Sequence, residues 1–464
     1  MSKRIYLSTA IAVLLSHPFG VSAANDADLQ AIREQIQQLK QSDEQRNMQL
    51  EQRLQQAEAN SQQAKSVAAQ AQAAAQQPVR SSAVPSSENS FNPAVSLILS
   101  GIYGQLRQNP SIPATGFAMN ANNTGYTRGF SLKESELGIA ANIDPQFRGV
   151  GTFSLDPAGG ISVENAFVQS SALGNGLNLK MGRFFSGLGY LNEQHAHAWD
   201  FADQPLVYRV LWDNQIGDDG LQLKWLAPTD MFVELGGEIG RGRGFPGSDR
   251  QNKNGSGAGV LFAHLGDDIG IEQSWRAGAS LHETRRENAV SNAVPDLTGT
   301  VGGVNNSFTG DSRTAGLDFV WKYSPNGNFR ERYLKVQSEY FQRKENGLLT
   351  YTSTGTGITD TYSNIQSGWY LQSVYQFMST WRTGLRYDRL DPGTASVGAP
   401  IAGKVISDYA FNPSRLTWMA DYNPSEFSRI RLQLAHDNSR QGLADNQLFV
   451  QYIMSLGAHG AHQF

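Results

Sequence analysis

The chain has 464 residues, with 38 Lys and Arg against 42 Asp and Glu, and a formal net charge of -4. It contains no Cys, which excludes a disulfide-stapled fold and a cysteine-linked lipid anchor, and its small negative charge argues against nucleic acid as a partner. With 47 Gly, 22 Phe, 16 Tyr and 8 Trp, the composition suits an exported β-protein with many turns.

The N-terminal segment, residues 1–23, predicts a secretory signal peptide. Lys3 and Arg4 precede an apolar run over residues 5–15, and small residues around Ala23 offer a cleavage site. That run is about half of the roughly 20 residues that a membrane-spanning helix needs. We therefore expect a cleaved leader and an exported mature chain.

Residues 24–77 predict an α-helical coiled coil, which we place in the periplasm. From residue 26 to residue 77 the sequence has no Gly, Pro or aromatic residue. The opposite face of this helix is polar, so it has no second layer of its own and needs partner chains. Homo-oligomerisation is the expectation, and a solvated single helix is the alternative. The apolar residues at a/d spacing are Leu29, Ile32, Ile36 and Leu39.

A flexible linker is predicted over residues 78–95, because Pro78 ends the helix and Ser, Pro and Asn follow. Residues 96–464 then alternate short turn signals with longer polar segments. Seven turns and eight long loops define about 16 antiparallel strands, with both chain ends on one side. The turns lie at 144–145, 174–176, 227–230, 266–268, 325–327, 378–380 and 423–425. The long segments lie around 108–127, 156–160, 185–216, 241–256, 284–311, 344–363, 388–408 and 437–446.

Side chains within the predicted strands alternate between apolar and polar. Leu317, Phe319 and Trp321 alternate with Asp318 and Lys322, and the last strand carries apolar residues at every second position from Leu448 to Leu456, in the same parity as the terminal Phe. Sixteen strands enclose a lumen too wide for strand side chains to fill. We therefore expect the apolar face to point outward and the fold to be an all-β transmembrane barrel around an aqueous channel, preceded by the coiled coil.

With this arrangement of leader, coiled coil, Ser/Pro linker and barrel, the chain resembles bacterial outer-membrane porins, including the phosphate-selective and sugar-specific porin families. The resemblance implies an outer-membrane homotrimer whose third extracellular loop, here about 185–216, folds into the barrel and narrows it. It would place Glu193, Asp200 and Asp203 in the pore.

Basic residues of three late strands occupy the alternate positions that we expect to face the lumen. The set is Arg382, Arg386, Arg415, Arg429 and Arg431. Opposed to an acidic third loop, they would form a constriction that orients dipolar solutes. The alternative is that these arginines pair with wall carboxylates and only stiffen the barrel. An acidic loop would repel phosphate, which argues against strong phosphate selectivity.

Two histidines of the third loop, His195 and His197, offer a possible zinc site. They lie on one face of an extended segment beside Glu193 and Asp200, and imidazole with carboxylate suits a divalent transition metal. The simpler interpretation is that both histidines line the pore without metal, in which case the protein has no cofactor. A second pair, His459 and His462, lies near the C-terminus.

No enzymatic motif stands out: the chain has no GxSxG, HExxH or P-loop pattern and no Cys nucleophile. The sequence predicts a porin for passive diffusion of small hydrophilic solutes or ions, with outer-membrane lipid around it. One alternative is a specific channel for zinc or its complexes. Another is a structural tether between outer membrane and cell wall through residues 26–77.

Overall fold

The computed structural model of the chain describes residues 37, 40, 41 and 48 and residues 93–457 apart from 111, 120–125, 156–158, 171–172, 249, 292–304, 353–356 and 406. The chain divides into two compact units, Met1–Ser90 and Phe91–Phe464, and every described strand lies in the second. The predicted signal peptide, most of the linker, His459, His462 and Phe464 lie outside the described residues. Of the predicted coiled coil, four described residues are helical, and the rest lies outside the described part.

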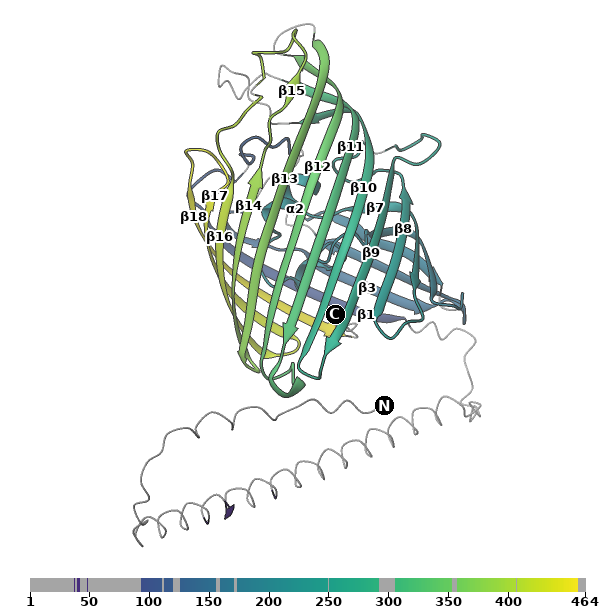
Figure 1. Ribbon diagram of the computed structural model, residues 1–464, viewed down its shortest axis with the longest axis vertical. Helices are drawn as coiled ribbons and strands as arrows, with labels where there is room; N and C mark the ends of the chain where they lie inside the picture. Colours follow the sequence, from purple (N-terminus) through teal and green to yellow (C-terminus); the bar gives the residue numbers. More distant parts are fainter. Residues whose placement is uncertain are drawn as a thin grey trace, which may run out of the picture. The chain divides into compact units, whose positions relative to one another are not determined.

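The second unit is one antiparallel sheet closed into a barrel, which Figure 1 shows from the side. Following the strand pairings from neighbour to neighbour gives a ring of sixteen strands within residues 93–457. The ring closes where β1 pairs with β18, from Ser96 opposite Gly457 to Gln105 opposite Leu448. Two further short strands pair at the rim and do not enter the ring. The predicted sixteen-stranded barrel is therefore confirmed.

The strands of the ring are β1 (Ala94–Gln105), β3 (Ser135–Asn142), β4 (Phe147–Leu155), β5 (Ile161–Ser170), β6 (Leu177–Phe185), β7 (Gly217–Leu226), β8 (Phe232–Gly240), β9 (Ala258–Ile269), β10 (Gln273–Ser291), β11 (Asn305–Tyr323), β12 (Tyr333–Thr352), β13 (Ile358–Met378), β14 (Trp381–Asp391), β16 (Ser414–Ser425), β17 (Ser428–Asn438) and β18 (Asp445–Gly457). The rim strands are β2 (Gly129–Leu132) and β15 (Ser396–Val397). The helices are η1 (Ala196–Ala198), α2 (Leu206–Trp212) and η2 (Pro325–Gly327). No helix in the described part of the chain is both long and apolar enough to cross a membrane.

Alternation along the strands follows the predicted parity, as β14 illustrates. Trp381, Leu385 and Tyr387 are exposed on the outside, while Arg382 and Arg386 point inward and are buried. Leu385 is 54% exposed and Arg386 only 1%. Because successive side chains of a strand point to opposite faces, this pattern gives an apolar exterior and a charged interior.

Four neighbouring strands, β10 to β13, are 19 to 21 residues long, and we call them the tall wall; the other strands of the ring have 8 to 13 residues. The predicted long loops at 284–311 and 344–363 were therefore wrong in extent, because strand residues occupy much of both segments. The polarity that suggested loops belongs to outward-facing cross-strand ion pairs. Within the first segment, Arg285 pairs with Asp311 at 3.8 Å, and both side chains are more than half exposed. When polarity is the main signal in the sequence, strands with charged outer faces are mistaken for loops.

The barrel interior contains an apolar core that the sequence did not predict. The connection from β6 to β7, residues 186–216, carries α2, whose sequence LVYRVLW is almost entirely apolar and buried. Leu206, Val207 and Trp212 join a cluster with inward residues such as Phe341 and Tyr370. A helix that is hydrophobic around its circumference needs such surroundings on all sides. The division into an apolar outside and a charged inside is therefore incomplete, because apolar side chains fill part of the lumen.

Candidate functional site

The third long connection, residues 186–216, lies across the inside of the barrel. Its backbone amides donate hydrogen bonds to inward side chains of widely separated strands. Gly187 N donates to Glu238 on β8 at 2.8 Å, and Ala202 N donates to Gln433 on β17 at 2.8 Å. Figure 1 shows α2 of this connection within the barrel, and the helix contacts β13 and β14. The connection thereby brings its polar residues into contact with the lumen wall.

Asp203 is the centre of the most buried charged group. One of its oxygens lies 2.8 Å from Arg386 Nη2, and Arg415 contacts the other oxygen. Tyr126 donates its hydroxyl proton to the same carboxylate at 2.5 Å, and Gln433 donates at 3.1 Å. Burial alone would raise the pKa of Asp203, but Arg415 and Arg386 outweigh it and hold that pKa far below its usual range. The carboxylate is therefore ionised.

Asp200 forms a second charged group nearer the end of the barrel that carries the short connections. Arg382 Nη1 lies 3.0 Å from one oxygen, Lys335 contacts the other, and Gln372 donates at 3.1 Å. Burial would raise the pKa of Asp200, but Lys335 and Arg382 lower it to about 2. Arg382 is shared with Asp421, an inward residue of β16 that the sequence analysis did not single out.

The remaining predicted arginines, Arg429 and Arg431, also converge on Asp421. Arg431 lies 2.8 Å from it and Arg429 3.7 Å. Glu193 lies apart from this set, since its ion pairs are with Lys224 at 3.1 Å and Lys180 at 4.0 Å. The predicted residues thus form an Asp203 group, an Asp200–Asp421 group and a separate Glu193 group. In the first two, acid and base touch directly instead of facing each other across water.

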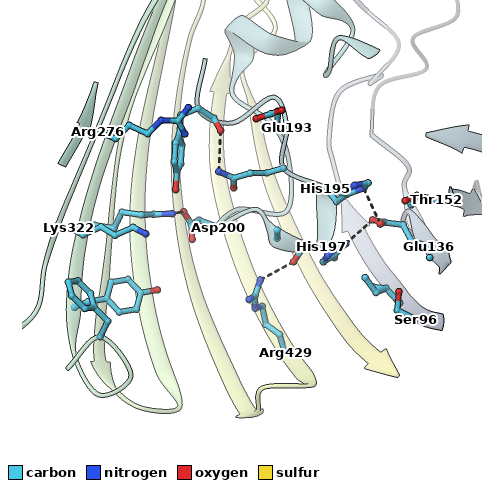
Figure 2. Close-up of a pocket in the computed structure, with 18 of the residues that line it drawn as sticks. Ser96, Glu136, Thr152, Glu193, His195, His197, Asp200, Arg276, Lys322 and Arg429 are labelled. Atoms are coloured by element: carbon cyan, nitrogen blue, oxygen red, sulfur yellow. Dashed lines mark hydrogen bonds and ion pairs between the residues drawn. The ribbon is translucent and has the colours of Figure 1, made fainter. Parts of the chain in front are cut away.

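His195 and His197 lie side by side, with ring centroids 5.8 Å apart, as Figure 2 shows. His195 Nδ1 is 2.9 Å from Glu164 on β5 and 3.1 Å from Glu136 on β3, and His197 Nδ1 is 2.8 Å from Glu136. The expectation that Glu193 and Asp200 would flank the histidines was wrong. Both of those acids are held by lysines and arginines elsewhere, whereas β3 and β5 lie beside the histidines.

Protonation of His195 follows from this environment. Burial lowers its pKa, but the hydrogen bonds and charges of Glu136 and Glu164 outweigh that effect and raise the pKa to about 10. His195 is therefore cationic at neutral pH unless another cation replaces its proton. Asn165 completes the contacts of the ring, since its side-chain amide lies 2.9 Å from His195 Nε2 and can turn its oxygen toward the Nε2 proton.

A cavity of about 1240 Å³ borders these groups and includes residues of the short connections in its lining. Five cations from β10, β11, β12, β14 and β17 line one side, and we call them the basic arc: Arg276, Lys322, Lys335, Arg382 and Arg429. His195, His197 and Glu136 line the cavity as well. Arg276 makes no ion pair within residues 93–457 as described, and its guanidinium lies over the Tyr190 ring at 5.4 Å. Arg276 and Lys335 were not predicted from the sequence, and Lys322 was predicted only as a polar residue of its strand, although strand parity was a usable signal for all three.

Comparison with known proteins gives distant matches. No family model matches the chain. A protein of Aquifex aeolicus (strain VF5), described only as uncharacterized, is 29% identical over 414 residues, which are 82% of this chain and 81% of that protein.

Solved structures similar to this chain include outer-membrane proteins of low sequence identity. A loop-deletion form of OmpT of Vibrio cholerae is 11% identical, with 78% of this chain and 99% of that chain covered and a TM-score of 0.49. The anion-selective porin from Comamonas acidovorans is 12% identical over 78% and 99%, with a TM-score of 0.47. The channel DcaP of Acinetobacter baumannii is 9% identical over 78% and 97%, with a TM-score of 0.45. The porin-like barrel architecture rests on the pairing of this chain's own strands.

Replacing Asp203 by Asn should destabilise the protein strongly. The change leaves Arg386 and Arg415 buried without their carboxylate, and breaking a buried pair costs about 3–5 kcal/mol. Urea unfolding of protein refolded into vesicles, followed by Trp fluorescence, measures the loss. The matched control is Asp311→Asn, because Asp311 pairs with Arg285 at 3.8 Å on the exposed outer face, and its loss should stay within about 1 kcal/mol. Equal effects of the two changes would contradict a structural role for Asp203.

The contribution of Asp200 should depend on pH in the acid range. Its folded-state pKa of about 2 lies below the roughly 3.9 of an unfolded chain. Its stabilisation is therefore complete above about pH 4 and is lost as the pH falls toward 2. The difference in unfolding free energy between wild type and Asp200→Asn should shrink between pH 5 and pH 2.5. A difference that stays constant would show that the carboxylate charge does not contribute.

Proposed function

We propose that this protein is an outer-membrane porin that lets small hydrophilic solutes diffuse passively, with a preference for anions. The observation that carries the proposal is the closed ring of sixteen strands with apolar side chains on its outer face and ionised side chains on its inner face. In lipid, a closed barrel is the strand architecture that satisfies all its backbone hydrogen bonds. An apolar exterior around a polar interior is the arrangement of outer-membrane barrels.

The outer surface supports a membrane location. On β13 and β14, Leu371 is 48% exposed and Leu385 54%, and such exposure over many strands is costly in water. Aromatic pairs stand at two levels of this surface. Trp381 and Tyr422 have ring centroids 4.8 Å apart at the start of β14, and Trp369 and Tyr387 have centroids 5.7 Å apart further along it. Aromatic residues at two levels are typical of membrane interfaces.

The basic arc supports the preference for anions. Within it, Asp200 pairs with Lys335 and Arg382, while Arg276 keeps its charge without an ion pair in the described part of the chain. The cavity lining contains six Lys and Arg residues, since Arg148 joins the arc, against four Asp and Glu residues. A water-filled space lined by excess positive charge concentrates anions and repels cations.

The third connection is proposed as the filter of this channel. Its contacts with Gln433 and Glu238 support that role, because they place it between opposite parts of the wall. The homotrimer and the periplasmic coiled coil over residues 24–77 expected from the sequence remain parts of the proposal. The tether function would depend on residues 26–77, nearly all of which lie outside the described part.

Placing a charge among the exposed apolar side chains on the outside of the barrel, which we call the outer belt, tests the membrane location. Leu385 lies on β14 between the two aromatic levels, and Leu385→Arg should reduce the folding free energy in lipid vesicles by about 2–4 kcal/mol, the cost of an arginine near the bilayer midplane. The matched change Gln342→Arg lies on the outer face of β12, beside the charged part of the tall wall, and should cost about 0–1 kcal/mol. Urea titration of refolding measures both. If the two variants fold equally well, the outer belt does not face hydrocarbon.

Planar bilayer recordings under a KCl gradient test the channel and its selectivity. The wild-type protein should give steady current with a reversal potential of the sign expected for chloride preference. Arg276→Gln should lower the chloride-to-potassium permeability ratio about twofold, because a unit charge acting through water at roughly 8 Å changes an ion's energy by about 0.5 kcal/mol. Lys344→Gln, on the exposed outer face of β12, is the matched control and should leave the ratio unchanged. Absence of current would refute the porin proposal, and potassium preference would refute its anion part.

A further inference from the structure

We propose that Glu136, Glu164 and His195 bind a divalent transition-metal ion such as Zn²⁺, which fastens the third connection to the β3–β5 wall. The inference goes beyond solute diffusion and does not depend on it. It differs from a zinc channel because the ion is a bound structural ligand and not the transported solute.

The three side chains converge as metal ligands do. One donor atom from each, His195 Nδ1 and a carboxylate oxygen from each glutamate, lie within 4.8 Å of one another. His195 Nδ1 is 2.9 Å from Glu164 Oε2 and 3.1 Å from Glu136 Oε2. Ligands about 2.0–2.1 Å from one ion are separated by about 2.9 Å in octahedral and 3.4 Å in tetrahedral geometry. The two separations from His195 Nδ1 fall in that range, and the two glutamate oxygens lie within 4.8 Å of each other.

A metal ion satisfies this arrangement of ligands better than a proton on His195 Nδ1 does. Nδ1 carries a single N–H, which points directly at one acceptor, yet two carboxylate oxygens lie at nearly equal distances from it. A divalent ion in place of that proton would interact with both carboxylates and with the imidazole lone pair at once. It would also offset the mutual repulsion of the two glutamates.

Neighbouring groups orient the three ligands. His197 Nδ1 lies 2.8 Å from Glu136 Oε1, the oxygen not directed at His195, and Asn165 lies 2.9 Å from His195 Nε2. An asparagine amide can present either its oxygen or its nitrogen, so it can accept the Nε2 proton of a metal-bound imidazole. Outer partners of this kind fix the ring orientation of ligating histidines.

Glu134 supplies a second observation that points to a cation. Its Oε1 is buried, and no nitrogen or hydroxyl donor among the described residues reaches it. Its polar neighbours are the other carboxyl groups, since it hydrogen-bonds to Glu164 and is repelled by the charges of Glu164 and Glu136. Three carboxylates thus share this part of the wall with two imidazoles. Glu134 is available as a fourth ligand or as a further neutralising charge for the ion.

Access and ligand chemistry fit a transition metal. Glu136, His195 and His197 line the cavity of about 1240 Å³, so an ion can reach the ligands from the lumen. Imidazole with carboxylates suits Zn²⁺, Co²⁺ or Ni²⁺, whereas Mg²⁺ and Ca²⁺ prefer oxygen ligands alone.

A second histidine–glutamate pair in the same barrel provides the matched control. His264 Nδ1 lies 3.0 Å from Glu234, but the next charged neighbour of Glu234 is Lys224 at 3.7 Å, a cation. Within the described ranges, the Glu136–Glu164–His195 group alone brings three such ligand atoms within reach of one ion. A transition-metal ion should therefore bind to the Glu136–Glu164–His195 group and not to the His264–Glu234 pair.

The test is Zn²⁺ binding to the full-length protein in detergent, stripped with chelator and measured by calorimetry. His459→Asn and His462→Asn are included throughout so that the C-terminal histidines cannot contribute. We expect one Zn²⁺ per chain and no saturable binding of Mg²⁺. His197→Gln should weaken Zn²⁺ about 10- to 100-fold, as loss of an outer partner does, and Glu164→Gln should weaken it further. His264→Gln should leave the affinity unchanged.

Co²⁺ titration of the same protein, followed by visible absorption, gives a measurement that requires no ligand variant to fold. A saturable absorption band at one equivalent, displaced by Zn²⁺, supports the site. Absence of saturable Zn²⁺ or Co²⁺ binding would overturn the proposal. Equal affinity in the wild-type, Glu164→Gln and His195→Gln proteins would also overturn it. Folding of each variant is checked by the shift in its gel migration on heating. Because binding is measured without any conduction, failure of the metal site and failure of the porin proposal are distinguishable.

Discussion

Closure of the sheet between β1 and β18 is the constraint on which the rest of the structure depends. It pairs the first strand of the barrel with the last, about 350 residues later in the chain, and leaves no unpaired edge in the ring. With the backbone groups satisfied within the sheet, the outer side chains can be apolar without a covering layer. The same closure creates an interior that strand side chains alone do not fill. The third connection occupies part of that space.

That connection is held by two kinds of contact with different consequences. The α2 side chains, such as Leu206 and Trp212, pack on inward residues of the tall wall and contribute through apolar burial, which has no strict geometry. Asp200 and Asp203 form ion pairs with arginines. Removing either partner of a buried ion pair is strongly destabilising, because it leaves the other charge buried and uncompensated. Apolar packing therefore keeps the connection inside the barrel, while the ion pairs fix its position along the wall.

The sequence was sufficient for features that depend on local pattern. Parity along β14 placed Arg382 and Arg386 in the lumen, and turn spacing yielded the strand number. Features that depend on contacts across the barrel were not predictable in the same way. Glu136 and Glu164 lie 59 and 31 residues before His195 in the chain, and only the closed register of β3, β5 and the third connection brings them together. The helix α2 had a signal in its apolar run, but a run of that length does not distinguish helix from strand.

The charges of the lumen are divided between two walls, and the third connection supplies the opposite charge to each. Toward the basic arc it presents Asp200, and toward the glutamates of β3 and β5 it presents the cationic His195. Neither neutralisation is complete, since Arg276 remains without an ion pair on one side and Glu134 keeps a buried oxygen without a partner on the other, both within the described residues. The residual positive charge borders the open cavity and can act on passing solutes through water. The unpaired Glu134 oxygen is buried beside a convergent set of ligands, where a bound cation can act as its partner.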